Sequence, residues 1–217
     1  MKVLVLASQK GGVGKTTLSG HLAVEAERTG YGLVALIDTD PQGGLTGWWR
    51  VRQGDSLPMI AVQPAGLGAT LDALREAGVA LVVIDTPPAI TASIREVVAL
   101  ADLVLVPAKP SPHDLRAVGA TVDIVEQAGK PLVFAVNQAT ARARITTEAI
   151  MALSQHGTIA PVTIHHRVDF ATSMTDGRVV AELDKPTKSA DEITALWAYL
   201  NSRLERLTRN GKPTHSA

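Results

Sequence analysis

The chain alternates between two kinds of hydrophobic pattern. Short, almost continuous apolar runs such as VLVLA and LVVI predict strands that are covered on both faces. Longer amphipathic stretches separate most of these runs and predict helices. The expected strands are Lys2–Ala7, Leu33–Asp38, Met59–Gln63, Leu81–Asp85, Leu103–Pro107 and Leu132–Asn137. The expected helices are Thr16–Thr29, Leu67–Ala77, Ile90–Leu100, His113–Gln127, Thr146–Gln155 and Ala190–Leu207.

This alternation is typical of βαβ units, and it predicts an α/β fold with an open, mostly parallel twisted sheet and helices on both faces. A chain of 217 residues with 46% hydrophobic content has the size of a single domain. No repeat, linker or break in composition divides it. We therefore expect one domain over residues 1–208 and a disordered polar tail over residues 209–217, RNGKPTHSA.

Charge and cysteine content narrow the possible functions. Lys plus Arg and Asp plus Glu number 21 each, so any DNA binding must come from a local basic patch. The chain has no cysteine, which excludes disulfides, thiolate metal sites, iron–sulfur clusters and thiol catalysis. The start of the chain is too short for a signal peptide, and no apolar run approaches the roughly 20 residues of a membrane span. We expect a soluble, cytoplasmic protein.

The first expected strand runs into QKGGVGKTT, residues Gln9–Thr17. This segment misses the phosphate-loop pattern G-x-x-x-x-G-K-[ST] by one position, because Gln9 stands where the pattern has glycine. It also carries an additional lysine, Lys10, beside a pair of glycines. The role of this second lysine is the question that the loop raises.

The chemistry of the loop suits a nucleotide's phosphates. Gly11, Gly12 and Gly14 allow successive backbone N–H groups to turn towards phosphate oxygens, and the N-terminus of the next helix adds its dipole. Lys15 supplies a positive charge. The hydroxyl of Thr16 is available to a magnesium ion.

Aspartates close two of the expected strands. Asp38 ends the second strand and is followed by Asp40, and Asp85 ends the fourth. Ligands of open parallel sheets bind outside the carboxyl ends of the strands. An aspartate in this position beside a phosphate loop holds magnesium directly or through water. A carboxylate that caps a helix is the structural alternative for Asp85.

Taken together, KGGVGKTT, DTDPQ and VVIDTPP resemble the ParA/MinD family of deviant Walker ATPases, in the same order and over most of the chain. GYGLVALIDTDPQGGLTGW and PAKPSPHDLRAVGATV resemble the small ParA type, which includes ParF and McdA proteins and lacks an N-terminal DNA-binding domain. The resemblance implies a P-loop NTPase fold, ATP, ADP and Mg²⁺ as ligands, and a slow ATPase that a partner stimulates.

The resemblance also implies roles for single residues. Lys10 would reach across an ATP-sandwich homodimer to the phosphates of the other subunit, although a solvated loop lysine is the alternative. Asp40 would orient or activate the attacking water, with Asp38 near the magnesium shell. Asn137 would contact adenine, although a turn asparagine is the alternative. An extra residue in Gly30–Gly32 departs from the family and should change only a surface turn.

The implied sites are therefore as follows. The catalytic residues are Lys10, Lys15 and Asp40. The nucleotide-binding residues are Lys10, Gly11, Gly12, Val13, Gly14, Lys15, Thr16, Thr17 and Asn137. The magnesium ligands are Thr16, Asp38 and Asp85. The segment TIHHRVDFATSMTDGRVV resembles the family's stretch that closes over the base and leads to DNA-binding basic residues.

The candidate DNA-binding residues are Arg167, Arg178, Lys185 and Lys188. Lys188 aligns with a family arginine that contacts DNA, whereas the other family arginine falls on Asp169, which leaves Arg167 as a possible substitute. Arg203, Arg206 and Arg209 add charge to the last helix, and a solvated helix face explains them equally well.

The leading hypothesis is a positioning switch. An ATP-bound dimer would bind nucleoid DNA without sequence preference, and a ParB-like or cargo adaptor protein would trigger hydrolysis and release. The cargo could be a plasmid, a chromosome region, a carboxysome or a chemoreceptor cluster. No membrane partner is expected.

The main alternative is a MinD-like switch on a membrane surface, which needs a terminal amphipathic helix. An apolar stripe is present on the last helix, and we expect it to pack on the domain; it consists of Ile193, Leu196, Trp197, Leu200, Leu204 and Leu207. A metabolic or redox P-loop enzyme is a further class: the lack of cysteine excludes an iron-protein reductase, and the Lys10 loop with DTDPQ disfavours a dethiobiotin synthetase. A nucleotide-binding protein that does not hydrolyse ATP remains a further alternative.

His165 and His166 are not expected to bind metal, because adjacent strand residues face opposite ways. Trp48 and Trp49 either mark a partner surface or, for at least one of them, pack in the core.

Overall fold

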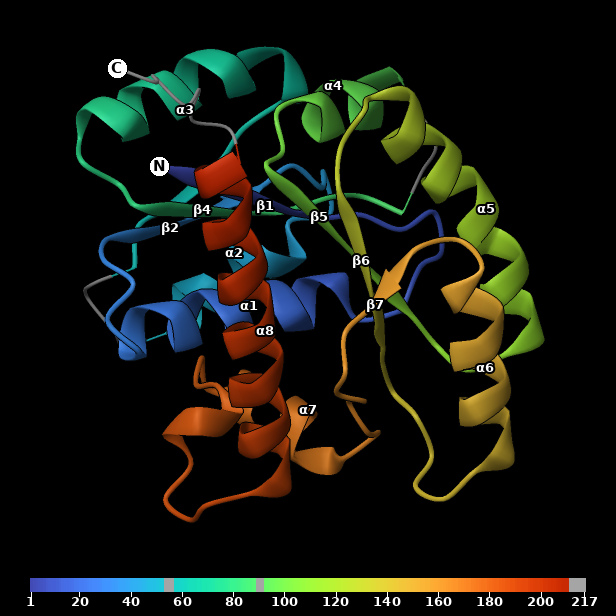
Figure 1. The fold of residues 1–217 in the computed structure, drawn as a ribbon. Helices are drawn as coiled ribbons and strands as arrows, with labels where there is room; N and C mark the ends of the chain where they lie inside the picture. Colours follow the sequence, from blue (N-terminus) through green and yellow to red (C-terminus); the bar gives the residue numbers. More distant parts are fainter. Residues whose placement is uncertain (53–56, 89–91, 211–217) are drawn as a thin grey trace, which may run out of the picture.

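The computed structural model describes residues 1–52, 57–88 and 92–210 of the chain (Figure 1). These residues contain a seven-stranded sheet with the order β3-β2-β4-β1-β5-β6-β7, in which every pair of neighbouring strands is parallel. The expected open parallel sheet is confirmed. The strands are β1 Lys2–Leu6, β2 Val34–Asp38, β3 Met59–Ala61, β4 Leu81–Asp85, β5 Leu103–Ala108, β6 Leu132–Val136 and β7 Thr158–Ile159.

The helices connect these strands and cover both faces of the sheet (Figure 1). Two short 3-10 turns are added, Pro64–Gly66 and Val180–Glu182. The pattern did not predict α2, α7 or the edge strand β7, and the first residues of the expected helix Ile90–Leu100 lie outside the described residues. The helices are α1 Lys15–Arg28, α2 Gly44–Val51, α3 Leu67–Glu76, α4 Ala92–Ala99, α5 Pro112–Gln127, α6 Arg144–Ser154, α7 Val168–Thr175 and α8 Lys188–Asn210.

Each face of the sheet has its own hydrophobic core, because successive side chains of a strand point to opposite faces. In β1, Leu4 and Leu6 belong to the core beneath α1, α2 and α8, whereas Val3 and Val5 belong to the core beneath α3, α4, α5 and α6. The central strands are buried on both sides, which explains their nearly continuous apolar sequences.

The apolar stripe of α8 packs inside the first of these cores. Ile193, Leu196, Trp197, Leu200 and Leu204 are buried there, and Leu207 is half-buried against it. The expectation that this stripe packs on the domain is confirmed. Within the described residues, no helix combines the length and the apolar character that a membrane span requires.

The tryptophans of α2 also serve packing. Trp48 is buried, and its indole N–H donates to the carbonyl of Arg178 at 3.4 Å. Trp49 is half-buried and donates to the carbonyl of Leu57 at 2.7 Å. Core packing therefore accounts for both residues without a partner surface.

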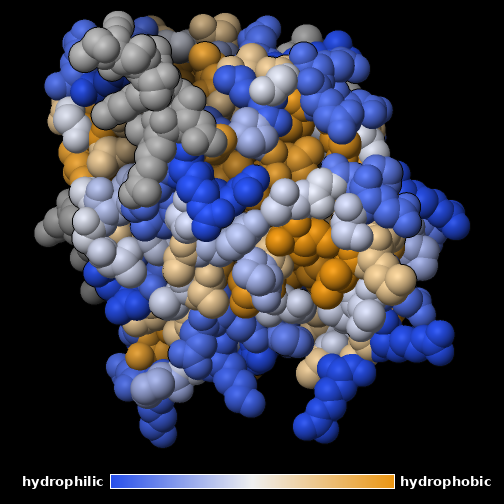
Figure 2. Space-filling view, viewed as in Figure 1, coloured by the Kyte–Doolittle hydropathy of each residue, from blue (hydrophilic) through white to orange (hydrophobic). Residues whose placement is uncertain are grey.

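The outer surface is largely hydrophilic in the view of Figure 2, with a hydrophobic area at the β7 edge of the sheet, between α8 and α6, and another higher up, towards α4 and α5. Helix α8 continues to Asn210, so Arg209 and Asn210 of the expected tail are helical. The rest of the expected tail, residues 211–217, lies outside the described residues.

Candidate nucleotide-binding site

The glycine loop between β1 and α1 has the conformation of a phosphate-binding loop. Gly12 and Gly14 have φ angles of 72° and 94°, in the left-handed region that favours glycine. Gly14 is the N-cap of α1. Among the described residues, the N–H groups of Gly11, Gly12 and Gly14 have no hydrogen-bond partner, which leaves them available to an anion at the helix N-terminus.

Two side-chain amides from the segment after β6 fix this loop from outside. Asn137 donates through Nδ2 to the carbonyl of Val13 at 2.7 Å, and Gln138 donates through Nε2 to the carbonyl of Gly12 at 3.0 Å. A Cβ on Gly14 would lie only 2.4 Å from Nδ2 of Asn137, so any other residue at position 14 would break this arrangement. Asn137, predicted as an adenine contact, thus also supports the phosphate loop.

Lys15 is buried inside the loop. Its Nζ donates to the carbonyls of Ser8 at 3.1 Å and Lys10 at 3.3 Å. Burial lowers the pKa of Lys15, while the charges of Asp85 and Asp40 act in the opposite direction. The ammonium group is therefore held within the curve of the loop, where the phosphates of a nucleotide would offer it stronger partners than two carbonyl groups.

Thr16 and Asp85 form the polar floor of the site. The hydroxyl of Thr16 donates to Oδ2 of Asp85 at 2.6 Å, and Asp85 is fully buried. Burial raises the pKa of Asp85 to about 7, with the nearby charges of Asp38 and Asp40 adding to the rise and the Thr16 bond and Lys15 opposing it. Oδ1 of Asp85 is buried without a hydrogen-bond partner among the described residues.

This oxygen chemistry fits a magnesium ion. Mg²⁺ prefers oxygen ligands and keeps several waters, so it needs only one or two protein groups. The Thr16 hydroxyl and the unpartnered oxygen of Asp85 are such groups. Within the described part of the chain, no cluster of three or more His, Asp or Glu side chains forms a metal site made by protein groups alone.

Asp38 has a different environment from Asp85, although the two residues pair across β2 and β4. Oδ1 of Asp38 accepts from the N–H of Asp40 at 3.0 Å, and Oδ2 accepts from the N–H and the hydroxyl of Thr46, each at 2.9 Å. Asp38 therefore binds the first turn of α2 and shapes the DTDPQ loop. Its place in the magnesium shell stays a prediction.

Asp40 faces the phosphate loop. Together with Gly11, Gly12, Lys15 and Thr16 it lines a pocket of about 250 Å³. Oδ1 of Asp40 accepts from the N–H of Gln42 at 2.9 Å. The structure thus brings the predicted water-positioning carboxylate to the same pocket as the predicted phosphate ligands.

A second pocket of about 190 Å³ adjoins the first on the side of α7. The two pockets share Gly14, Thr17 and Gln138, so they form one continuous cleft with a polar and a more apolar end. The apolar end has the character of a site for a flat base. Its lining comprises Gly14, Thr17, Leu18, Asn137, Gln138, His165, His166, Arg167, Phe170, Ala171 and Met174.

The single-residue predictions missed Gln138, Phe170 and Met174. The resemblance of the segment TIHHRVDFATSMTDGRVV indicated this region as the cover of the base, but it singled out no contact. Thr17 was predicted for the nucleotide site and lines both pockets. Val13 contributes its carbonyl to Asn137, and its side chain is buried.

Lys10 is exposed to solvent. Its N–H donates to the hydroxyl of Ser8 at 3.3 Å, and its carbonyl accepts from Lys15. The two lysines of the loop therefore differ in position, one buried and one open to solvent. A contact between Lys10 and a second subunit stays a prediction.

The candidate DNA-binding residues are not equivalent. Arg167 donates to Glu192 at 2.6 Å, and this hydrogen bond raises the pKa of Arg167. Arg178 is paired with Asp176 at 2.8 Å. Within the described residues, Lys185 and Lys188 are exposed and have no carboxylate within 4.0 Å.

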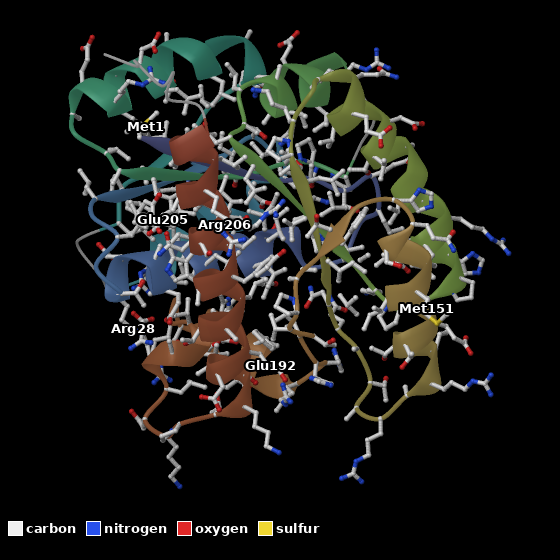
Figure 3. The ribbon with its side chains drawn as sticks, in the orientation of Figure 1. Met1, Arg28, Met151, Glu192, Glu205 and Arg206 are labelled. Atoms are coloured by element: carbon white, nitrogen blue, oxygen red, sulfur yellow. The ribbon has the colours of Figure 1, made fainter. Side chains whose placement is uncertain are left out.

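Glu192 of α8 binds His165 and Arg167, two residues of the wall of the base pocket. It accepts from the backbone N–H of His165 at 3.0 Å and from Arg167, and its Oε1 lies 2.7 Å from Nδ1 of His165. Figure 3 shows Glu192 on the half of α8 that lies beside α7. Ser189 adds a bond of 2.8 Å to Asp169. Arg167, predicted as a candidate DNA-binding residue, therefore lies in the wall of the nucleotide cleft.

A glycine loop between the first strand and first helix, a buried lysine within it, and an aspartate that ends the adjacent strand define a P-loop nucleotide-binding protein. The description "CobQ/CobB/MinD/ParA nucleotide binding domain" belongs to the family model that matches residues 4–196. The chain belongs to this family, whose ParA/MinD members are nucleotide-binding ATPases. The family resemblance predicted from the sequence is confirmed.

Two curated relatives are similar over different shares of the chain. The maintenance of carboxysome distribution protein A (McdA) of Halothiobacillus neapolitanus is 29% identical over 204 residues, covering 89% of this chain and 93% of the relative. The chromosome-partitioning ATPase Soj of Thermus thermophilus is 31% identical over 153 residues, covering 57% of this chain and 61% of the relative.

Solved structures confirm the fold. The ATP complex of a variant of Cyanothece McdA has a TM-score of 0.74 at 20% identity and covers 93% of this chain and 96% of that one. The cell division ATPase MinD of Pyrococcus furiosus has a TM-score of 0.76 at 17% identity and covers 93% and 99%. Because McdA and MinD share this fold, the fold alone does not decide which of the two this chain resembles in function.

Proposed function

We propose that this protein is a ParA-type positioning ATPase. ATP binding produces a sandwich homodimer that binds nucleoid DNA without sequence preference. A ParB-like or cargo adaptor protein then stimulates hydrolysis to ADP and phosphate, and the dimer leaves the DNA. The cycle segregates or spaces a plasmid, a chromosome region or a large protein cargo in the cytoplasm.

The different positions of Lys10 and Lys15 carry this proposal. Lys15 is buried within its own loop, where it serves the nucleotide of its own subunit. Lys10 belongs to the same loop but is exposed to solvent. Two polyphosphates cannot approach each other at an interface without added cations, and a lysine is a compact charge on a long stem. Lys10 therefore suits a contact with the nucleotide of the facing subunit, which makes ATP binding and dimerisation one event.

Hydrolysis needs three further functions at this site. The free N–H groups of the loop and Lys15 bind the phosphates. Thr16 and Asp85 would hold Mg²⁺, which would neutralise charge on the phosphate oxygens. Asp40 positions the attacking water from the other side of the pocket. The hydrogen bond from Gln42 orients Asp40, and Asp38 fixes the loop that carries it.

Two exposed lysines and the relatives support DNA, rather than a membrane, as the surface that the dimer binds. Lys185 and Lys188 are exposed near the N-terminus of α8. The apolar stripe of α8, which a membrane-binding helix would need, is buried in the core from Ile193 to Leu204. The relatives named for carboxysome distribution and chromosome partitioning suggest the two main classes of cargo.

The proposal is tested with Lys15→Ala. We expect this variant to lose ATP and ADP binding in calorimetry, because the phosphates lose their buried cation. The control is Lys130→Ala, which removes a half-exposed lysine beyond the far end of α5 and should bind like wild type. Unchanged nucleotide affinity in Lys15→Ala would contradict the site itself. Nucleotide-bound wild type that stays monomeric with ATP would contradict the switch.

A further inference from the structure

A third lysine lies beside the phosphate loop, and it comes from a different part of the chain. Strand β5 is the neighbour of β1 in the sheet, and the N–H of Ala7 donates to the carbonyl of Leu105 at 3.1 Å. The residue that follows β5 therefore lies beside the loop that follows β1. This residue is Lys109, and its Nζ lies 3.9 Å from the position that a Cβ on Gly12 would occupy.

The backbone of Lys109 is held in a fixed turn. The N–H of Ser111 donates to the carbonyl of Lys109 at 2.8 Å. Ser111 is also the N-cap of α5, and it accepts from the N–H of Asp114 at 3.2 Å. At the start of the phosphate loop, the N–H of Gln9 donates to the hydroxyl of Thr121 on α5 at 3.1 Å. The same helix thus positions both the lysine and the start of the phosphate loop.

Within the described residues, the ammonium group of Lys109 has no partner of opposite charge. Lys109 is half-exposed, and no carboxylate of the described residues lies within 4.0 Å of it. Gly12 presents no side chain, so the ammonium group can approach the loop closely. A cation kept unpaired beside an anion site is available to the anion itself.

We propose that Lys109 is a third phosphate-binding cation, which contacts the terminal phosphate of ATP bound in the same subunit. This inference rests on the proposed function, because it assumes that the cleft binds ATP. It adds a residue outside the loop to the phosphate ligands.

The shape of the cleft assigns Lys109 to the terminal phosphate. The base pocket and the phosphate pocket meet at Gly14, Thr17 and Gln138. Gly11, Gly12 and Asp40 line only the phosphate pocket. A nucleotide with its base beside Phe170 therefore places its last phosphate near Gly12, within reach of Lys109.

Negative charges close to the site explain why an additional cation would favour phosphate binding. Asp38, Asp40 and Asp85 end or follow the neighbouring strands, and each raises the electrostatic cost of bringing a polyphosphate to this edge of the sheet. Lys15 lies deep in the loop, and Lys10 is assigned to the facing subunit. Lys109 therefore offsets charge at the outer end of the phosphate chain, where the third phosphate distinguishes ATP from ADP.

The test compares Lys109→Gln with wild type in calorimetric titrations of AMPPNP and ADP, each with Mg²⁺. We expect the affinity for AMPPNP to fall about tenfold, which corresponds to about 1.4 kcal/mol, and the affinity for ADP to change by less than about twofold. Lys109→Arg should retain most of the affinity for AMPPNP because it keeps the charge. Lys130→Gln removes a lysine of similar exposure at the far end of α5 and should leave both affinities unchanged.

The same titrations in a Lys10→Ala background separate the two lysines. If Lys109 acts within its own subunit, the loss of AMPPNP affinity persists in this background, where dimers are not expected. A loss that disappears there would overturn the in-subunit contact. Equal affinities of Lys109→Gln and wild type for AMPPNP would overturn the inference while leaving the proposed function intact. Failure of wild type to bind either nucleotide would overturn both.

Discussion

The hydroxyl of Thr16 donates a hydrogen bond of 2.6 Å to Oδ2 of Asp85, and it joins the first turn of α1 to the end of β4. The other carboxyl oxygen of Asp85 has no partner among the described residues. Asp85 is thus a fully buried carboxyl group with a single neutral donor, and its pKa is raised to about 7. In the nucleotide-free protein, the buried carboxylate of Asp85 therefore destabilises the folded state at neutral and higher pH.

Asp85→Asn should stabilise the nucleotide-free protein at pH 8 but not at pH 4. A raised pKa means that the folded state binds a proton more tightly than the unfolded state, so the contribution of Asp85 to the free energy of unfolding falls as pH rises from about 4 to about 7. Asparagine carries no charge and removes this cost. We expect a gain on the order of 2 to 4 kcal/mol at pH 8, measured by urea unfolding.

The comparison must be the difference between variant and wild type, because His21 titrates in the same pH range with the opposite effect. Burial lowers the pKa of His21 to about 4, so its contribution to stability is lost as pH falls from about 6.5 towards 4. Asp123→Asn, at an exposed position on α5, is the matched control and should show no pH-dependent difference. A variant at Asp85 with wild-type stability at both pH values would contradict the buried, raised carboxyl group.

The sequence identified the strands and the phosphate loop because both depend on local patterns. Buried parallel strands are apolar throughout, and the loop needs glycines where φ is positive. Helix α2 was missed because it contains glycines and owes its start to Asp38, which binds Thr46 from the end of β2. Strand β7 is only two residues long and leaves no periodic signal.

The base pocket and the charge partners could not be predicted in the same way. Gln138 and Phe170 meet the phosphate loop and α1 only through the folding of distant segments. Arg167 counted as a free basic residue in the sequence, whereas Glu192, 25 positions away, binds it in the structure. The pattern of charges along a sequence does not show which charged residues form ion pairs in the folded protein.

Lys10→Ala should separate nucleotide binding from dimerisation. The side chain of Lys10 is exposed, so its removal leaves the loop, Lys15 and the Thr16–Asp85 contact in place. We expect ADP affinity within about twofold of wild type, since twofold corresponds to only about 0.4 kcal/mol, and no ATP-dependent dimer in sedimentation. A normal ATP dimer in this variant would contradict the cross-subunit role. Lys15→Ala provides the contrast, because it should lose both properties.

Asp40→Ala should trap the ATP-bound dimer. The only hydrogen bond that the side chain of Asp40 accepts in the described residues comes from Gln42, so its loss does not disturb the phosphate ligands. Positioned acid–base groups typically contribute a factor of about 100 to 10,000 in rate, and we expect phosphate release to slow by about 100-fold. The lifetime of the dimer after an excess of ADP is added gives a second measurement. Equal dimer lifetimes for the variant and wild type would contradict the proposed role of Asp40 in positioning the attacking water.

The DNA-binding surface should depend on Lys185 and Lys188, which are exposed and free of ion pairs within the described residues. Charge reversal at both positions should weaken binding of the ATP dimer to unrelated DNA sequences equally, because contacts with phosphates carry no sequence information. The slope of log affinity against log salt should fall by about 0.9 for each contact that is lost. ATP-dependent dimerisation should remain intact, since neither lysine lines the nucleotide cleft.

Two further variants decide whether this surface or another is responsible. Arg206→Glu changes a basic residue that Figure 3 shows towards the other end of α8 from Glu192, and it should leave DNA binding unchanged. Arg167→Glu should act differently, because it breaks the contact with Glu192 and places a charge in the wall of the base pocket. We expect it to weaken nucleotide binding first and DNA binding only as a consequence.

If the double variant of Lys185 and Lys188 binds DNA like wild type across a salt titration, the DNA-binding surface lies elsewhere. If wild-type ATP dimers ignore DNA but float with liposomes, the membrane-based switch replaces the nucleoid-based one.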